Sequence, residues 1–160
     1  MFLLPLCALP AAKEKEKTPP PVKLKTLRKA ARLALKNSAG QPQAEANLLA
    51  AVPREDISDK NRAGIYYLCA QLEESQNGIV NKQAFLKQKY DTATFFNKLL
   101  AMYRYLELCD SVDSVPNAQG KVRLSYKGRT HSLRMKHRRN IFNGGTFFLG
   151  KKDYASADKT

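Results

Sequence analysis

The chain has 160 residues, of which 43% are hydrophobic and 26% are charged. This length fits a single domain that can bury a core, which sets aside an assembly of several domains. Lys and Arg number 28 against 14 Asp and Glu, and the resulting net charge of +14 favours phosphates, anionic lipid or acidic protein surfaces as partners.

The N-terminus predicts export. Residues 1–12 form an apolar run that ends in small residues, and a Lys/Glu segment follows directly. This order is typical of a secretory signal peptide, and the run is too short for a bilayer span of about 20 residues. The basic leading region is missing, so we expect an incomplete signal cleaved near Ala11 or Ala12 and a periplasmic or cell-envelope protein. A cytoplasmic protein with an apolar tip is the alternative.

Residues 13–22 are rich in Lys and Pro and predict a flexible tether. Leu and Ala then recur at helical spacing with Lys and Arg on the far side, which predicts a helix over residues 24–36 that Gly40 ends. A second helix is predicted over residues 43–52 and closed by Pro53. The pair reads as a helical hairpin.

A longer helix is predicted over residues 59–76. Its inner stripe is Ile65, Leu68, Cys69 and Leu72. Glu73 and Glu74 are expected to face water. The Asn-Gly pair at 77–78 predicts a left-handed helix end, and a shorter helix over residues 80–87 is expected to follow.

The strongest helical pattern covers residues 92–110, with Asp91 as its cap. Its apolar band consists of Phe95, Phe96, Leu99, Leu100, Met102, Tyr103 and Leu106. A band this wide implies neighbours on two sides, as in a solenoid or a compact bundle. Residues 111–120 are loop-like in composition, and residues 121–126 are expected to be an extended loop.

Cysteine and histidine give no metal-binding pattern. Cys69 and Cys109 lie among apolar neighbours, which favours free buried thiols, although export would also allow them to pair. His131 and His137 are six residues apart and cannot converge on one helix face, so both are expected at the surface. We expect no cofactor and no metal.

Small and aromatic residues share one helical stripe near the C-terminus. Ile141, Gly145 and Phe148 follow i, i+4, i+7 spacing. Glycine inside a helix costs roughly 1 kcal/mol relative to alanine, so Gly145 makes sense where a neighbouring helix must come close. Ala157 is the expected opposing contact.

These residues resemble the tetratricopeptide repeat (TPR), a helix–turn–helix unit of about 34 residues. Ile141, Gly145, Phe148 and Ala157 take its fourth, eighth, eleventh and twentieth positions, and Tyr154 lies in its turn. The pattern departs from the family at Ile141, where Trp is frequent, and at residue 144, where Gly replaces Leu. The segment is also similar to exported TPR proteins of Bacteroides-type bacteria.

The resemblance implies an all-α fold in which antiparallel helix hairpins stack as a partial TPR-like α-solenoid. Residues 23–110 would form the helical-hairpin region, residues 111–137 a basic loop with a short helix over 132–138, and residues 138–160 an incomplete repeat. A repeat that starts near residue 138 would run to about residue 171, so we expect the chain to be truncated within a repeat. Self-association through the uncapped repeat is then expected.

The same region contains part of a phosphate-loop pattern. Residues 145–151 read G-x-x-x-x-G-K, but Lys152 follows where Ser or Thr would hold magnesium. Two phenylalanines and a leucine fill the interval and favour packing. We therefore do not expect a nucleotide site.

No motif for catalysis is present, so the chain is not expected to be an enzyme. The leading hypothesis is an interaction scaffold that binds a protein or peptide, with preference for an acidic one, in a groove lined by the first helix of each hairpin. The candidate partner-binding residues are Tyr66, Tyr103, Arg104, Tyr105, Arg134 and Arg138.

The alternative is a nucleic-acid-binding protein that uses the basic cluster of residues 121–139, with Tyr126 stacking on a base. Between residues 121 and 152 the chain has ten Lys or Arg and no Asp or Glu. The cluster consists of Lys121, Arg123, Lys127, Arg129, Arg134, Lys136, Arg138 and Arg139. The expected export and the lack of a known nucleic-acid module weigh against this alternative.

Overall fold

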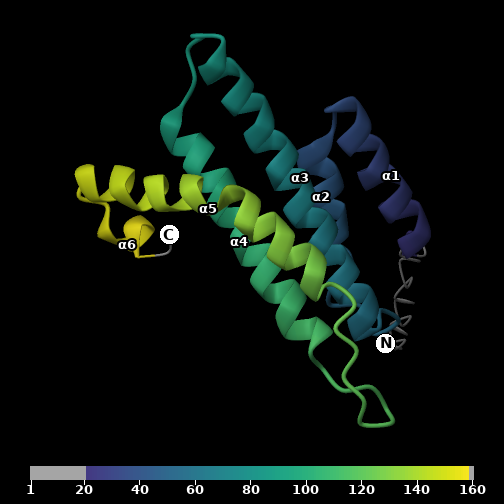
Figure 1. Cartoon of the computed structure of the whole chain (residues 1–160). Helices are drawn as coiled ribbons and strands as arrows, with labels where there is room; N and C mark the ends of the chain where they lie inside the picture. The colour runs from purple at the N-terminus through teal and green to yellow at the C-terminus, as the bar shows by residue number, and fades with distance from the viewer. Residues whose placement is uncertain (1–20, 159–160) are drawn as a thin grey trace, which may run out of the picture.

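The computed structural model describes residues 21–158, and within that range the chain is all-α and contains no strand (Figure 1). The helices are α1 (Leu24–Asn37), α2 (Gln41–Ala51), α3 (Asp59–Phe85), α4 (Thr92–Asp113), α5 (Lys127–Gly150) and α6 (Tyr154–Ala157). The predicted all-α class is confirmed. The predicted signal peptide and most of the predicted tether lie outside the described residues.

The long helices α3 and α4 form an antiparallel pair at the centre of the molecule (Figure 1). Helices α1 and α2 both pack against α3, on the N-terminal side of this pair. Helix α5 crosses α4, and the short helix α6 packs against α5. Each helix therefore packs against the next one in the chain, and α1 also contacts α3.

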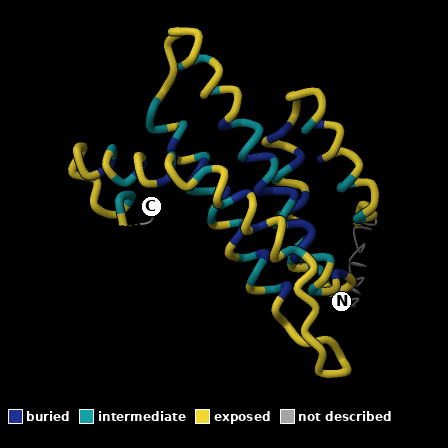
Figure 2. Tube along the Cα trace, in the orientation of Figure 1, coloured by how far each residue is buried: buried dark blue, intermediate teal, exposed yellow. Residues whose placement is uncertain are grey.

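Two apolar clusters lie on the two sides of this arrangement. The first joins α1, α2 and α3, and its fully buried members include Leu48, Ile65 and Leu72. The second joins α3, α4 and α5 and includes Leu99 and Leu106. Buried residues accordingly concentrate on both sides of α3, where it meets α1 and α2 on one side and α4 on the other (Figure 2). Each such Leu or Ile contributes about 1.5–3 kcal/mol by leaving water.

The sequence signals for α1, α2 and α4 are confirmed. Helix α1 begins at the predicted residue, and Gly40, with φ 68°, lies in the left-handed turn that separates it from α2. Asp91 caps α4, because its carboxylate accepts the N–H of Ala93 at 3.0 Å and the hydroxyl of Thr94 at 2.6 Å.

The predicted end of a helix at residues 77–78 is wrong. Helix α3 continues to Phe85, so no separate helix over 80–87 exists. Asn77 is only 2% exposed, and its side-chain amide donates to the carbonyl of Phe95 at 2.7 Å. The amide thus joins α3 to α4, and the backbone does not take the left-handed conformation that the Asn-Gly pair suggested.

The connection between α4 and α5 is shorter than predicted. Helix α4 includes residues 111–113, and α5 already begins at Lys127, so the predicted turn over 132–138 is part of one long helix. The segment 121–126 lacks regular structure, as expected. Asp113 accepts the backbone N–H of Tyr126 at 2.7 Å, which attaches the start of α5 to the end of α4.

The region that resembles a repeat is a helix, a turn and a short helix. Ile141 and Phe148 are buried in the second cluster, and Ala157 is partly buried against it. Gly144 is buried and Gly145 is half-buried. The phosphate-loop pattern lies within α5 up to residue 150, so its backbone amides belong to a helix and do not form a loop.

Candidate functional site

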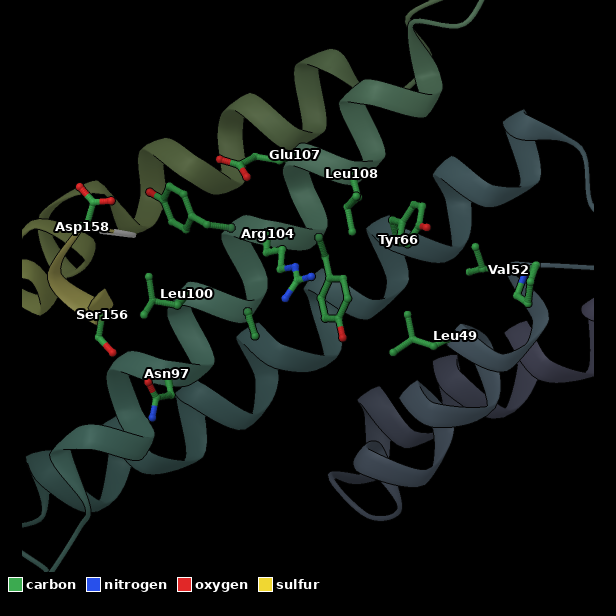
Figure 3. A pocket seen from close by; sticks show the side chains of 14 residues that line it. Leu49, Val52, Tyr66, Asn97, Leu100, Arg104, Glu107, Leu108, Ser156 and Asp158 are labelled. Carbon is green, nitrogen blue, oxygen red and sulfur yellow. The ribbon is translucent and has the colours of Figure 1, made fainter. Parts of the chain in front are cut away.

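A large hollow of about 1230 Å³ lies along α4, bordered by α2, α3 and α6 (Figure 3). We call it the tyrosine hollow. Its principal lining residues are Leu49, Tyr66, Leu100, Tyr103, Arg104 and Tyr105. Because Tyr103, Arg104 and Tyr105 are consecutive, they span about 200° of the helix surface, and the hollow therefore wraps around α4.

Four of the six candidate partner-binding residues line this one hollow. Tyr66 comes from α3, and Tyr103, Arg104 and Tyr105 come from α4.

The other two candidates lie on α5, outside the hollow. Arg134 forms an ion pair with Asp110, and Arg138 is exposed. The structure thus brings four of the predicted residues together and separates two from them.

The hydroxyls of two of these tyrosines are already used within the chain. Tyr103 donates to the carbonyl of Arg134 at 2.7 Å, and Tyr105 donates to the carboxylate of Glu45 at 2.7 Å. Burial raises the pKa of both phenols. These side chains therefore connect α4 to α5 and α2 and offer their rings to a ligand.

Other groups in the hollow are available to a ligand. Arg104 is exposed and makes no hydrogen bond or ion pair within residues 21–158, and the same holds for Glu107. Tyr66 is half-buried, and Leu100 and Leu108 add apolar surface (Figure 3). Asp158, which also lines the hollow, has no side-chain partner within the same range. The hollow can therefore bury apolar groups beside one unpaired cation and two unpaired anions.

A buried carboxyl behind the hollow was missed by the sequence reasoning. Glu73 is 4% exposed, and Lys98 donates to it at 3.1 Å. Desolvation, followed by a hydrogen bond to Glu45 and the charge of Glu45, raises the pKa of Glu73 to about 7. The expectation that Glu73 faces water is wrong. Its position four residues after the buried Cys69 was the signal that could have revealed it.

The neighbouring Glu74 has the opposite environment. It is also partly buried, and it accepts from Lys136 at 2.7 Å and contacts His137 at 3.0 Å. The hydrogen bond to His137 is the main reason that the pKa of Glu74 is lowered. The side chain of His137 is 11% exposed, so its predicted surface position is wrong, whereas His131 is exposed as expected.

Cys69 and Cys109 are free and buried. Burial raises the pKa of both thiols, that of Cys109 to about 12, so both act as small apolar core residues. Among residues 21–158 no three His, Cys, Asp or Glu side chains gather closely enough to hold a metal ion. Within the same range no helix has the length and apolar character needed to cross a membrane.

Comparison with known proteins returned no match to any family model, curated protein or solved structure.

Proposed function

We propose that this protein is a non-catalytic, TPR-like interaction scaffold that binds a protein or peptide segment in the tyrosine hollow. The observation that supports it is the convergence of Tyr66, Tyr103, Arg104 and Tyr105 on one hollow. Aromatic residues and Arg dominate binding energy at protein interfaces when they lie together around a pocket.

The lining suggests how a ligand would be held. Leu49, Leu100 and Leu108 provide apolar contact for one or two large side chains, and the ring of Tyr66 adds an aromatic wall. The unpaired guanidinium of Arg104 would pair with one acidic residue beside them, while Glu107 and Asp158 would disfavour a second one. An apolar segment with a nearby Asp or Glu is therefore the class of ligand that we propose.

The C-terminal helices α5 and α6 support the TPR-like part of the proposal. Ile141 and Phe148 on α5 and Ala157 on α6 share one apolar cluster across a turn, as the repeat pattern requires of its helix pair. Stacking of α1 to α4 as a solenoid and export through residues 1–12 are parts of the same proposal.

A random peptide library selected against the full chain tests the proposal. Selection is counter-screened on a double variant, Tyr66→Ala with Arg104→Ala, which removes the aromatic wall and the cation. Enriched peptides should combine a large apolar residue with an acidic one. Their affinity should fall by at least about tenfold in the double variant, equivalent to 1.4 kcal/mol.

A matched control is Tyr90→Ala with Arg139→Ala. These are exposed residues of the same two types, and neither lines the hollow. Peptides that bind wild type and the control alike but not the hollow variant support the proposal. If every selected peptide binds the hollow variant as well as wild type, the tyrosine hollow is not the binding site.

A further inference from the structure

A second hollow, of about 590 Å³, lies between α1, α3 and the start of α5. We call it the basic hollow. Its charged and aromatic lining residues are Arg28, Arg32, Lys36, Tyr67, Tyr126 and Arg129. None of the residues that line it is acidic. Four cations thus surround one depression without a compensating carboxylate.

Three of the cations come from one face of α1. Arg28, Arg32 and Lys36 are spaced i, i+4, i+8, which places them in a row along the helix. Arg28 donates to the carbonyl of Asn61 on α3 at 3.0 Å. Arg32 and Lys36 are exposed and make no hydrogen bond or ion pair with any part of the chain that the structure describes. Like charges at this spacing destabilise a helix, so an anionic ligand would relieve the repulsion.

Aromatic packing positions the fourth cation. The rings of Tyr67 and Tyr126 lie with centroids 5.4 Å apart, and the guanidinium carbon of Arg129 lies 5.8 Å from the centroid of Tyr126. The hydrogen bond from the backbone of Tyr126 to Asp113 fixes this residue at the end of α4. Arg129 is therefore presented on an ordered platform.

The glycine at position 64 lets two lining side chains of the basic hollow approach α3 closely. A Cβ on Gly64 would lie 2.7 Å from a guanidinium nitrogen of Arg28 and 2.8 Å from the hydroxyl of Tyr126. Both distances are too short for real contacts, so a larger residue would displace these two side chains. Gly64 thus allows Arg28 and Tyr126 to approach the same point on α3.

The basic hollow continues along α5 into a region whose additional charges are paired. A neighbouring hollow of about 540 Å³ shares Tyr67 and Arg129 and extends to Lys136. Its acidic residue, Glu74, is already paired with Lys136. The row of Arg28, Arg32 and Lys36 extends about 12 Å along α1. This row is longer than a single phosphate group, which points to a polyanion.

We propose that the basic hollow and its extension bind single-stranded nucleic acid. Arg32, Lys36 and Arg129 contact backbone phosphates, and bases lie against the Tyr67–Tyr126 pair. Single-stranded nucleic acid fits better than an acidic peptide. It carries one phosphate charge per nucleotide, and its flat bases can stack on tyrosine rings. The site differs from the basic cluster of residues 121–139, because α1 supplies most of its cations and Arg134 is paired with Asp110.

Fluorescence anisotropy with the full chain and a labelled oligouridine of about 16 nucleotides tests the proposal. The variant is Arg32→Gln with Lys36→Gln. Its matched control is Lys25→Gln with Lys29→Gln, which removes the same charge from exposed positions of α1 outside the hollow. The hollow variant should bind about tenfold more weakly or worse, and its salt slope should fall by about 1.4 because two phosphate contacts are lost. The control should stay within about threefold of wild type.

Three results would overturn the proposal. The first is the absence of binding by wild type at low salt. The second is an equal loss in both double variants, which would mean that net charge alone attracts the RNA. The third is competition by an oligoglutamate of equal charge that matches competition by unlabelled oligouridine, because the site would then select acidic peptide.

Discussion

Two consecutive tyrosines on α3 line two different hollows. Tyr66 faces the tyrosine hollow beside α4, and Tyr67 faces the basic hollow beside α1 and α5. Successive residues on a helix point about 100° apart, so one step along α3 moves a side chain from one environment to the other. The first hollow mixes apolar and aromatic side chains with one cation and two anions, whereas the second has only cations among its charged residues.

The two glutamates that follow on the same helix repeat this division. Glu73 turns toward α2 and α4, where Glu45 and Lys98 lie, and Glu74 turns toward Lys136 and His137 on α5. The net charge of +14 therefore says little about any one surface. The helix register of α3 decides which neighbours each charge meets.

The largest effect is expected from the apolar core between α3, α4 and α5. Leu99 is fully buried between α3, α4 and α5. Leu99→Ala should lower the free energy of unfolding by about 2–5 kcal/mol, because it leaves a cavity in the core. Urea denaturation measures the change. Leu33→Ala, at an exposed position of α1, should change it by less than about 0.5 kcal/mol. A similar loss in both variants would mean that α3 and α4 do not form the common core.

The glutamate pair predicts opposite pH dependences on the two sides of α3. The pKa of Glu73 is raised to about 7, so between pH 4.5 and 7 the unfolded chain ionises this carboxyl while the folded chain keeps it protonated. The contribution of Glu73 to the free energy of unfolding is therefore fully present below pH 4.5. It falls by up to about 3 kcal/mol as the pH rises from 4.5 to 7. Glu45, Lys98, Tyr105 and Cys69 are the titratable groups that face it.

Glu73→Gln should remove the loss of stability that accompanies a rise in pH. Glu74→Gln should instead remove a loss of stability that accompanies a fall in pH. The pKa of Glu74 is lowered, so its stabilisation is present above the pKa of the unfolded chain and is lost as pH falls through the folded value. Denaturation of wild type and both variants from pH 4 to pH 8 measures the slopes. A wild-type slope that Glu73→Gln leaves unchanged between pH 5 and 7 would show that Glu73 is ionised in the folded protein.

A variant of Asp110 should lower stability less than Leu99→Ala does, and it should affect the basic hollow but not the tyrosine hollow. Asp110 accepts from the hydroxyl of Thr130 at 2.7 Å and pairs with Arg134, so it holds the first turns of α5 on α4. Asp110→Ala should cost about 1–3 kcal/mol and increase hydrogen exchange near the start of α5. RNA binding in the basic hollow should weaken, while the peptides selected for the tyrosine hollow should still bind.

Asp56→Ala is the matched control for this variant. Asp56 pairs with Arg54 at the surface, so its loss should cost less than about 1 kcal/mol. Equal effects of Asp110→Ala on both ligands would mean that the two hollows do not respond separately to the position of α5.

Local sequence signals predicted the helices well because those signals act within a few residues. The Asp91 cap, the turn at Gly40 and the apolar band of α4 all depend on nearest neighbours along one helix. The end of α3 was predicted wrongly because Asn77 bonds to a carbonyl on another helix. That contact depends on how α3 meets α4, which no local pattern encodes.

The two candidate sites also differ in how far the sequence predicts them. Tyr66 and the run from residue 103 to 105 could be selected because aromatic and Arg side chains lie on strongly helical patterns. The basic hollow could not be predicted, since Arg32 and Arg129 are far apart in the chain and meet only when α1 and α5 both pack near α3. The sequence did single out Tyr126 and Arg129 as nucleic-acid contacts, but it gave no sign that the i, i+4 row of basic residues on α1 would join them.

Gly64→Ala is expected to change the stability of the fold little and yet to weaken RNA binding. Alanine favours the helix by about 0.5–1 kcal/mol, but its Cβ displaces the tip of Arg28 from its bond to Asn61, so the net change should stay within about 1 kcal/mol. RNA affinity should nevertheless fall severalfold, because Arg28 and Tyr126 lose their arrangement, while peptide binding in the tyrosine hollow stays unchanged. Thermal unfolding and anisotropy on one preparation measure both effects. Undiminished RNA binding would mean that the charge of α1, without the shape of the basic hollow, accounts for the affinity.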